Sequence, residues 1–469
     1  MKQIKLSSMA VALAGVFMLS AGHSAMADST EDLVNALVAK GVLTYEEAAP
    51  LMKDHDSERA AQEKASKSGG KIKIAEFIDN ATLYGDIRVR AEYRDGSGPG
   101  TTAGTDVDEN RSRDRYKLVF GIKTTAGDFY TDLALAMGAG GRSDNATFGK
   151  TTYNDKEAVF IKRAMVGWNA TDWLTLEAGR MANPLYTTSM VWDGDLTFEG
   201  LTEKAKFKAG SADVFLTASQ VQYLGDKKSF PQLPHGGTTS VTNELLAFQG
   251  GARFPITDNV SAKAALTYAT FTHDSNKSSG IFKPGIDTST AAGVASVGVN
   301  DLNTIEIPAE INFMAANNIG FRVFGDYVNN LSGNDRADAA CKAQASACGK
   351  GSDDTAWLLG VGLGSAKDLK TFESNKMAKG DWNAKIWYQD VGVYSVDPNA
   401  VDSDFMDSRV NMKGVVFKAQ YNVRDNVAVN FAAGHATRKN DSLGTAGAGD
   451  LALNLKDFDL YQLDLTYSF

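Results

Sequence analysis

Charged side chains occupy every second position in two neighbouring runs of the sequence. The first run carries Asp86, Arg88, Arg90, Glu92 and Arg94, separated by Ile87, Val89, Ala91 and Tyr93. The second carries Arg111, Arg113, Arg115 and Lys117. A spacing of two puts the charges of each run on one face of a β-strand. Arginine is always charged and holds anions through two parallel hydrogen bonds, so this pattern suits anion binding.

The charged face of each run must avoid lipid if the strands cross a membrane, because a charge on the lipid side costs roughly 2–4 kcal/mol near the midplane. Adjacent antiparallel strands would then place one basic ladder on a single wall of a channel. Its members are Arg88, Arg90, Arg94, Arg111, Arg113, Arg115 and Lys117. We expect these pore-lining residues to focus a positive field on passing ions. The alternative is that acids of the lumen neutralise them and the charges only hydrate the wall.

Other chemistry lacks a supporting pattern. Serine, histidine and acid pairs show no spacing typical of a hydrolase, and the five histidines show none typical of a metal site. Neither cysteine begins a haem attachment motif. The formal charge of −9 argues against a nucleic-acid partner. We therefore expect no catalytic residue, no metal, no cofactor and no enzyme activity, and rank a barrel enzyme last.

Both ends of the chain indicate export to an outer membrane. Residues 461–469 alternate apolar and polar side chains and end on Phe469, as the closing strand of an outer-membrane barrel does. A basic start, an apolar stretch over 9–19 and Ala25-Met26-Ala27 predict a signal peptide over residues 1–27. Its removal takes away Lys2 and Lys5 and no acid, which lowers the formal charge from −9 to −11. No later stretch offers about 18 uninterrupted apolar residues, so a membrane-spanning form must be a closed barrel.

The remaining chain divides into two parts. Residues 28–70 predict two short helices and a charged linker in the periplasm, which could form a coiled coil or remain a tethered helix. Residues 71–469 predict an all-β, transmembrane, antiparallel up-and-down barrel of about sixteen strands. The expected strands are 80–94, 110–124, 127–138, 156–170, 172–180, 196–209, 211–224, 241–255, 257–272, 302–316, 319–331, 354–366, 380–395, 411–423, 425–437 and 456–469. Short turns alternate with long loops between them.

Two features stand out from this alternation. The connection 367–379 is long although its place predicts a periplasmic turn, and it reads as an insertion. Cys341 and Cys348 lie in an expected external loop, and the oxidising compartment favours a disulfide between them.

Several segments carry a family resemblance. They are AGRMANPL at 178–185, MVWDGDLTFEG at 190–200, GDW at 380–382, YQD at 388–390, DSDF at 402–405 and LVAKGVLTYEEA at 37–48. Together they resemble the putative porin family of Gram-negative bacteria. The resemblance implies a sixteen-stranded, trimeric channel and does not name a solute. It also implies that the loop over 181–195 folds inward, so that Asp193, Asp195 and Glu199 oppose the basic ladder. The alternative is that Trp192 and these acids cap the rim.

We therefore predict an outer-membrane porin through which small hydrophilic solutes and ions diffuse passively, with a mild preference for anions. Its partners would be outer-membrane lipid, lipopolysaccharide and two further copies of the chain in a homotrimer. The acidic loop residues Asp402, Asp404 and Asp407 could bind divalent cations that bridge lipopolysaccharide, although such runs are more often only solvated. The alternative function is a non-transporting adhesin or structural anchor of the outer membrane.

Overall fold

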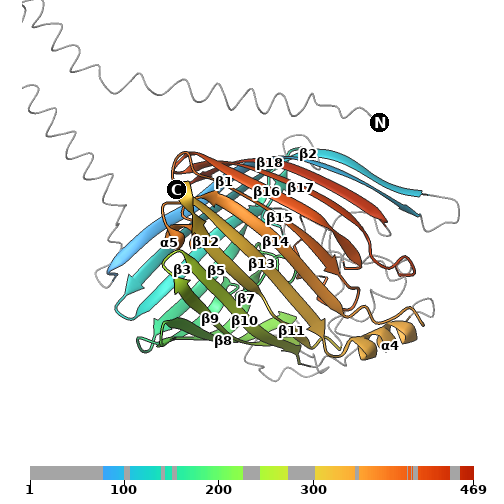
Figure 1. Cartoon of the computed structure of the whole chain (residues 1–469), viewed down its shortest axis with the longest axis horizontal. Helices are drawn as coiled ribbons and strands as arrows, with labels where there is room; N and C mark the ends of the chain where they lie inside the picture. The colour runs from blue at the N-terminus through green and yellow to red at the C-terminus, as the bar shows by residue number, and fades with distance from the viewer. Residues whose placement is uncertain are drawn as a thin grey trace, which may run out of the picture. The chain divides into compact units, whose positions relative to one another are not determined.

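The computed structural model describes residues 78–99, 106–138, 143–149, 156–224, 243–272, 301–343, 348–398, 400–402, 404, 410–443 and 455–469. The chain divides into two compact units, Met1–Leu83 and Tyr84–Phe469. The expected signal peptide and the helices of 28–70 lie outside the described residues. The second unit contains the barrel, and its strands are drawn in chain order from blue to red in Figure 1.

All sixteen expected strands have a counterpart among the described residues. The barrel strands are β1 (Asn80–Pro99), β2 (Asp106–Ala126), β3 (Phe129–Gly138), β5 (Ala158–Asn169), β6 (Leu174–Ala182), β7 (Thr197–Ala209), β8 (Ala212–Leu224), β9 (Asn243–Thr257), β10 (Val260–Phe271), β11 (Thr304–Glu306) continued by β12 (Ala309–Ala315), β13 (Ile319–Asn330), β14 (Thr355–Ser365), β15 (Trp382–Val391), β16 (Met412–Arg424), β17 (Val427–Arg438) and β18 (Asp457–Ser468). A two-residue strand, β4 (Ala146–Thr147), pairs with β2. The prediction of a sixteen-stranded antiparallel barrel is confirmed.

One expected strand, 302–316, is divided into β11 and β12. Both segments pair with β10 on one side and β13 on the other, so they occupy one position in the barrel. Pro308 stands in the gap and has no N–H to donate to the ladder, which interrupts the strand there.

The barrel closes between its first and last strands. β1 and β18 pair antiparallel from Asp86↔Ser468 to Ser97↔Asp457. The terminal Phe469 exchanges two backbone hydrogen bonds of 3.0 Å with Gly85. A Cβ at Gly85 would lie 2.6 Å from the Phe469 ring, so only glycine fits beneath the last side chain. The prediction from the terminal alternation is confirmed.

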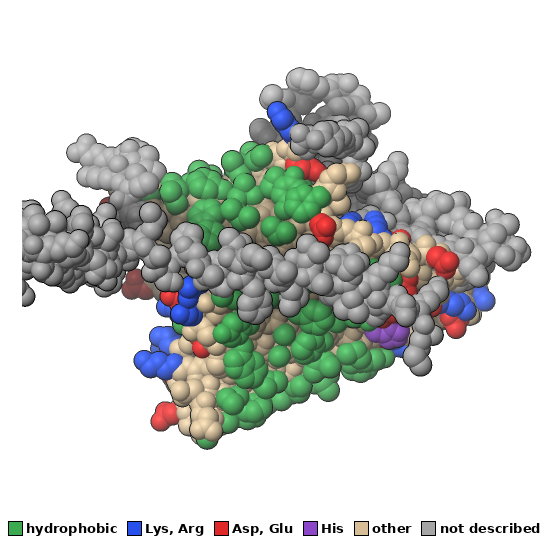
Figure 2. Space-filling view, turned by 90° about the horizontal axis from the view of Figure 1, so that it is seen from above, with side chains coloured by type: hydrophobic (Ala, Val, Ile, Leu, Met, Phe, Trp, Pro, Cys, Tyr) green, Lys and Arg blue, Asp and Glu red, His purple; other side chains and the backbone are tan. Residues whose placement is uncertain are grey.

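The two faces of each strand differ as lipid and water require. On β1, Ile87 and Val89 are 46% and 45% exposed, whereas Arg90 between Val89 and Ala91 is 4% exposed. The described outer surface in Figure 2 is mostly hydrophobic, and charged side chains gather toward its margins. The large apolar side chains are therefore on the outside, as in a membrane barrel.

Among the described residues, short helical segments occur in three of the connections. α4 (Gly333–Ala343) lies in the β13–β14 connection, α5 (Leu369–Glu373) in the β14–β15 connection, and the 3₁₀ turn η1 (Ala316–Asn318) joins β12 to β13. α4 and α5 lie at opposite ends of the strands in Figure 1, with the C-terminus at the α5 end. Buried apolar residues of the β15–β16 connection, such as Val393, Tyr394 and Val401, pack with inward side chains of β16–β18.

Candidate functional site

The basic ladder is organised around one buried carboxylate. Glu92 has a fully buried side chain, and its carboxylate lies 2.8 Å from Nε of Arg94, 2.5 Å from Nε of Arg113 and 3.7 Å from Nη1 of Arg115. Gln462 of β18 donates a further hydrogen bond of 3.0 Å. Glu92 thus offsets much of the repulsion among the arginines of β1 and β2.

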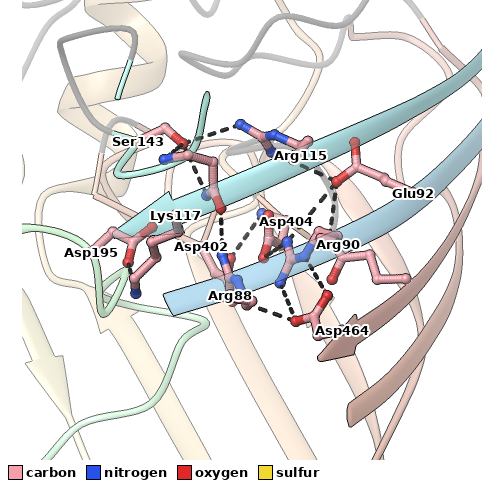
Figure 3. A network of polar contacts seen from close by, with 12 residues as sticks. Arg88, Arg90, Glu92, Arg115, Lys117, Ser143, Asp195, Asp402, Asp404 and Asp464 are labelled. Atoms are coloured by element: carbon pink, nitrogen blue, oxygen red, sulfur yellow. Dashed lines mark hydrogen bonds and ion pairs between the residues drawn. The ribbon is translucent and has the colours of Figure 1, made fainter. Parts of the chain in front are cut away.

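Arg90 is held by two further acids (Figure 3). Its Nε and Nη2 donate to the two carboxylate oxygens of Asp464 at 2.7 and 2.9 Å, because these residues stand directly opposite each other on β1 and β18. Its Nη1 donates to Asp404 at 2.8 Å. Asp404 belongs to the β15–β16 connection, so this ion pair ties that connection to β1.

The other ladder residues follow the same face. Arg88 donates to Asn145 and lies 3.7 Å from Asp464. Lys117 lies 3.8 Å from Asp86 and 3.9 Å from Asp195. Arg111 pairs instead with Glu109 on its own strand at 3.0 Å, nearer the start of β2. The structure therefore brings six of the seven predicted ladder residues into one network with acids and places Arg111 beside it.

The connection after β6 runs across the inner wall. Tyr186 and Gln249 of β9 exchange two hydrogen bonds of 2.8 Å. Thr187 donates to Glu306 of β11, and Thr188 donates to Asp326 of β13. Gln249, Glu306 and Asp326 are buried on the inner wall, so residues 186–188 of this connection lie inside the barrel.

The three acids predicted for this loop have different surroundings. Asp195 faces the ladder through Lys117. Asp193 is buried, and its Oδ1 accepts the backbone N–H of Asp195 at 2.8 Å, so it shapes the turn. The prediction that Glu199 opposes the basic ladder is wrong. Glu199 lies on the opposite face of β7 from buried Phe198 and Thr202 and pairs with Arg180. The strand begins at Thr197, before Glu199, and the alternation of β7 turns this side chain outward.

The connection between β15 and β16 supplies acids that the sequence did not assign to the pore. Asp404 contacts Arg90, and Asp402 lies 3.8 Å from Nζ of Lys418 on β16. Burial alone would raise the pKa of Asp404, but Arg90, Lys418 and Arg88 together outweigh it and hold the pKa well below the ordinary value. Burial raises the pKa of Asp402. Their alternation in DSDF at 402–405 was visible, but no sequence signal showed that the loop turns inward.

The connection 367–379, expected in the periplasm as an insertion, lies against the inner wall. Glu373 of α5 forms a 2.8 Å ion pair with Arg253 of β9 and also accepts from Ser261 of β10. Phe372 covers Gly320 of β13, where a Cβ would lie 2.4 Å from the ring. The extra length therefore occupies the interior at the end of the barrel where the C-terminus lies.

Cys341 and Cys348 form a disulfide with a Cα–Cα distance of 4.5 Å. Cys341 is part of α4, at the end of the barrel away from the C-terminus (Figure 1). The bridge closes a short loop, and no hydrogen bond or ion pair among the described residues joins either cysteine to the ladder.

A cavity of about 450 Å³ adjoins the ladder. Its charged lining residues are the cations Arg88, Arg90, Arg322, Lys385 and Lys418 and the acids Asp404 and Asp464. Both acids bind Arg90, and five cations against two acids leave a formal excess of three positive charges in the lining. In the part of the chain that the structure describes, no group of three or more His, Cys, Asp or Glu could hold a metal ion.

No helix among the described residues is long and apolar enough to cross a membrane.

A closed barrel with an apolar exterior, a charged interior and a loop folded across it defines the class of outer-membrane channels. The family described as "Putative porin" matches residues 91–292 and 286–439. These matches cover more than half of the chain, which therefore belongs to that family. The match confirms the resemblance found in the sequence. Family and fold both point to a channel and not to an enzyme.

Solved structures with a similar fold include three outer-membrane proteins. The outer membrane channel DcaP of Acinetobacter baumannii is 12% identical, with a TM-score of 0.42 over 86% of this chain and 99% of that one. OprB of Pseudomonas putida is 10% identical, with a TM-score of 0.49 over 83% and 94%. Salmonella typhi OmpF, solved with daunomycin, is 12% identical, with a TM-score of 0.43 over 84% and 99%. No curated protein sequence matches this chain significantly.

Proposed function

We propose that this channel lets small hydrophilic solutes and ions diffuse passively across the outer membrane, with a mild preference for anions. The observation that carries the proposal is the positive lining of the cavity beside the ladder, where five cations meet two acids that both bind Arg90. A passing anion there meets more cations than acids along the lining, in a low-dielectric wall that strengthens the field. The preference is mild because Glu92 and Asp195 offset other ladder charges.

The surroundings of the barrel belong to the same proposal. Residues 1–27 would direct export, residues 28–70 would lie in the periplasm, and the barrel of 71–469 would assemble as a homotrimer among lipid and lipopolysaccharide. Chemical crosslinking of the purified protein followed by native mass measurement tests the trimer. N-terminal sequencing of the mature chain tests the cleavage after Ala27.

Single-channel recording in planar bilayers tests transport. Purified protein should give stable conductance steps in KCl, and a reversal potential in a salt gradient should show a small excess of anion permeability. An adhesin or structural anchor with a closed interior would give no steps. Steps with a clear cation preference would contradict the assignment of the positive lining.

A further inference from the structure

The cations of the cavity that come from outside the basic ladder lie in one row across four neighbouring strands. Arg322 of β13 stands opposite Gly362 of β14, Gly362 opposite Lys385 of β15, and Lys385 opposite Lys418 of β16. We call Arg322, Lys385 and Lys418 the wall cluster. Like charges directly opposite each other on neighbouring strands are destabilising, so the Lys385–Lys418 pair calls for a compensating negative charge.

The residues that the structure describes supply part of that charge. Lys418 lies 3.8 Å from Asp402, and Arg322 lies 3.7 Å from Glu310. Lys385 forms no ion pair with a carboxylate among the residues that the structure describes, and its side chain is exposed to the interior. Removing one lysine would be the simpler way to relieve the repulsion. The arrangement instead suits a site whose negative charge comes from a ligand.

The wall leaves room for that ligand. Gly362 presents no side chain between Arg322 and Lys385, and a Cβ built there would be 3.5 Å from the Cβ of Lys385 and 3.8 Å from that of Arg322. Ala432, opposite Lys418 on β17, is also small. A hollow with cations on both sides therefore opens into the 450 Å³ cavity.

Aromatic rings adjoin the same cations. The Phe372 ring lies 5.2 Å from the guanidinium of Arg322. The Trp387 ring lies 5.4 Å from Nζ of Lys385 and 5.8 Å from Nζ of Lys418. Cation–π contacts of this kind orient the cations but do not neutralise them, because the rings carry no net charge. Phe324 and Phe372 also line the cavity, so an apolar group beside the anion would find contacts there.

From this geometry we infer that the wall cluster binds the carboxylate of a small organic anion, with Phe324 and Phe372 contacting its apolar remainder. This inference rests on the proposed porin function and names the solute class of the same cavity. A carboxylate between Lys385 and Lys418 would receive charge-assisted hydrogen bonds and relieve the repulsion between the two lysines. Neutral solutes of the same shape would lack that interaction.

Benzoate block of KCl current in planar bilayers tests the site, with benzamide as the neutral probe of similar shape. Wild-type conductance should fall saturably with benzoate and should not respond to benzamide. Lys385→Gln should raise the half-blocking benzoate concentration about tenfold, as expected for one lost charge-assisted hydrogen bond. Gly362→Leu, which fills the hollow and keeps every charge, should weaken the block to a similar degree.

Lys123→Gln is the matched control, since it removes the same charge from β2 and does not line the cavity. It should leave the benzoate block unchanged. Equal block of wild type, Lys385→Gln and Gly362→Leu would overturn the inference while KCl conductance upheld the porin function. Absence of KCl conductance in all proteins would instead overturn the proposed function. If Lys123→Gln and Lys385→Gln raised the half-blocking benzoate concentration equally, the block would depend only on the total charge of the channel. That result would overturn the inference of a local site.

Discussion

Replacing Arg90 with glutamine should shift the selectivity of the channel toward cations. The guanidinium of Arg90 binds Asp464 at 2.7 Å and Asp404 at 2.8 Å, so its loss leaves two carboxylates on that wall without their main counterion. Ladder side chains face the water of the pore, so we expect the barrel itself to remain intact. The structure adds that Arg90 is buried and anchors the β15–β16 connection. We therefore also expect larger current fluctuations as that segment loosens.

The size of the shift follows from Coulomb's law. One unit charge about 6 Å from a passing ion in water changes its energy by about 0.7 kcal/mol. Passing cations are stabilised by this energy and passing anions are destabilised by it, so the cation-to-anion permeability ratio should rise about tenfold. Screening weakens the effect, because the Debye length is about 10 Å at 0.1 M salt and about 3 Å at 1 M. The shift should therefore shrink in concentrated salt.

The assay is the reversal potential of the purified channel in a KCl gradient at low salt. Arg90→Lys is the control that keeps the charge but loses the two-point grip on Asp464, so it should retain wild-type selectivity. Asp404→Asn removes the opposing charge and should shift the reversal potential in the other direction. If Arg90→Gln matches wild type at low salt, passing ions do not sample this wall. The ladder then hydrates the barrel and does not select ions.

Three further outcomes are expected. Glu92→Gln should lower barrel stability by up to about 3–5 kcal/mol, because the buried arginines around it lose their carboxylate partner. Unchanged thermal unfolding in detergent would show that pore water solvates these arginines instead. Serine at both Cys341 and Cys348 should cost about 2–3 kcal/mol of local stability and speed proteolysis near α4 without altering conductance; equal protease resistance would contradict this. Because burial raises the pKa of Asp402, lowering the pH from 7 should protonate it before an ordinary aspartate and increase anion permeability near Lys418. Asp402→Asn should lack that part of the pH response, and a variant that keeps it in full would assign the response to another carboxyl.

Local alternation was enough to determine the barrel. A side chain on a strand faces lipid or water according to the parity of its position, so Ile87 and Arg88 report their faces without any tertiary information. Alternation also found the sixteen strands and their closing pair. An expected external loop in an oxidising compartment predicted the Cys341–Cys348 bridge that the structure contains. The one misplaced acid, Glu199, was grouped with the acids of the 181–195 loop, whereas it lies on the outer face of β7.

Tertiary structure decided which charges meet. Asp464 is 374 residues from Arg90 in the chain, and only closure of the barrel puts them opposite each other. The inward folding of the segments around Tyr186, Asp404 and Phe372 depends on contacts with distant strands, which carry no local periodic signal. Lys385 and Lys418 likewise become neighbours through the register of two strands. The sequence therefore determined the wall and the types of charge on it, whereas the site arose from long-range register and loop packing.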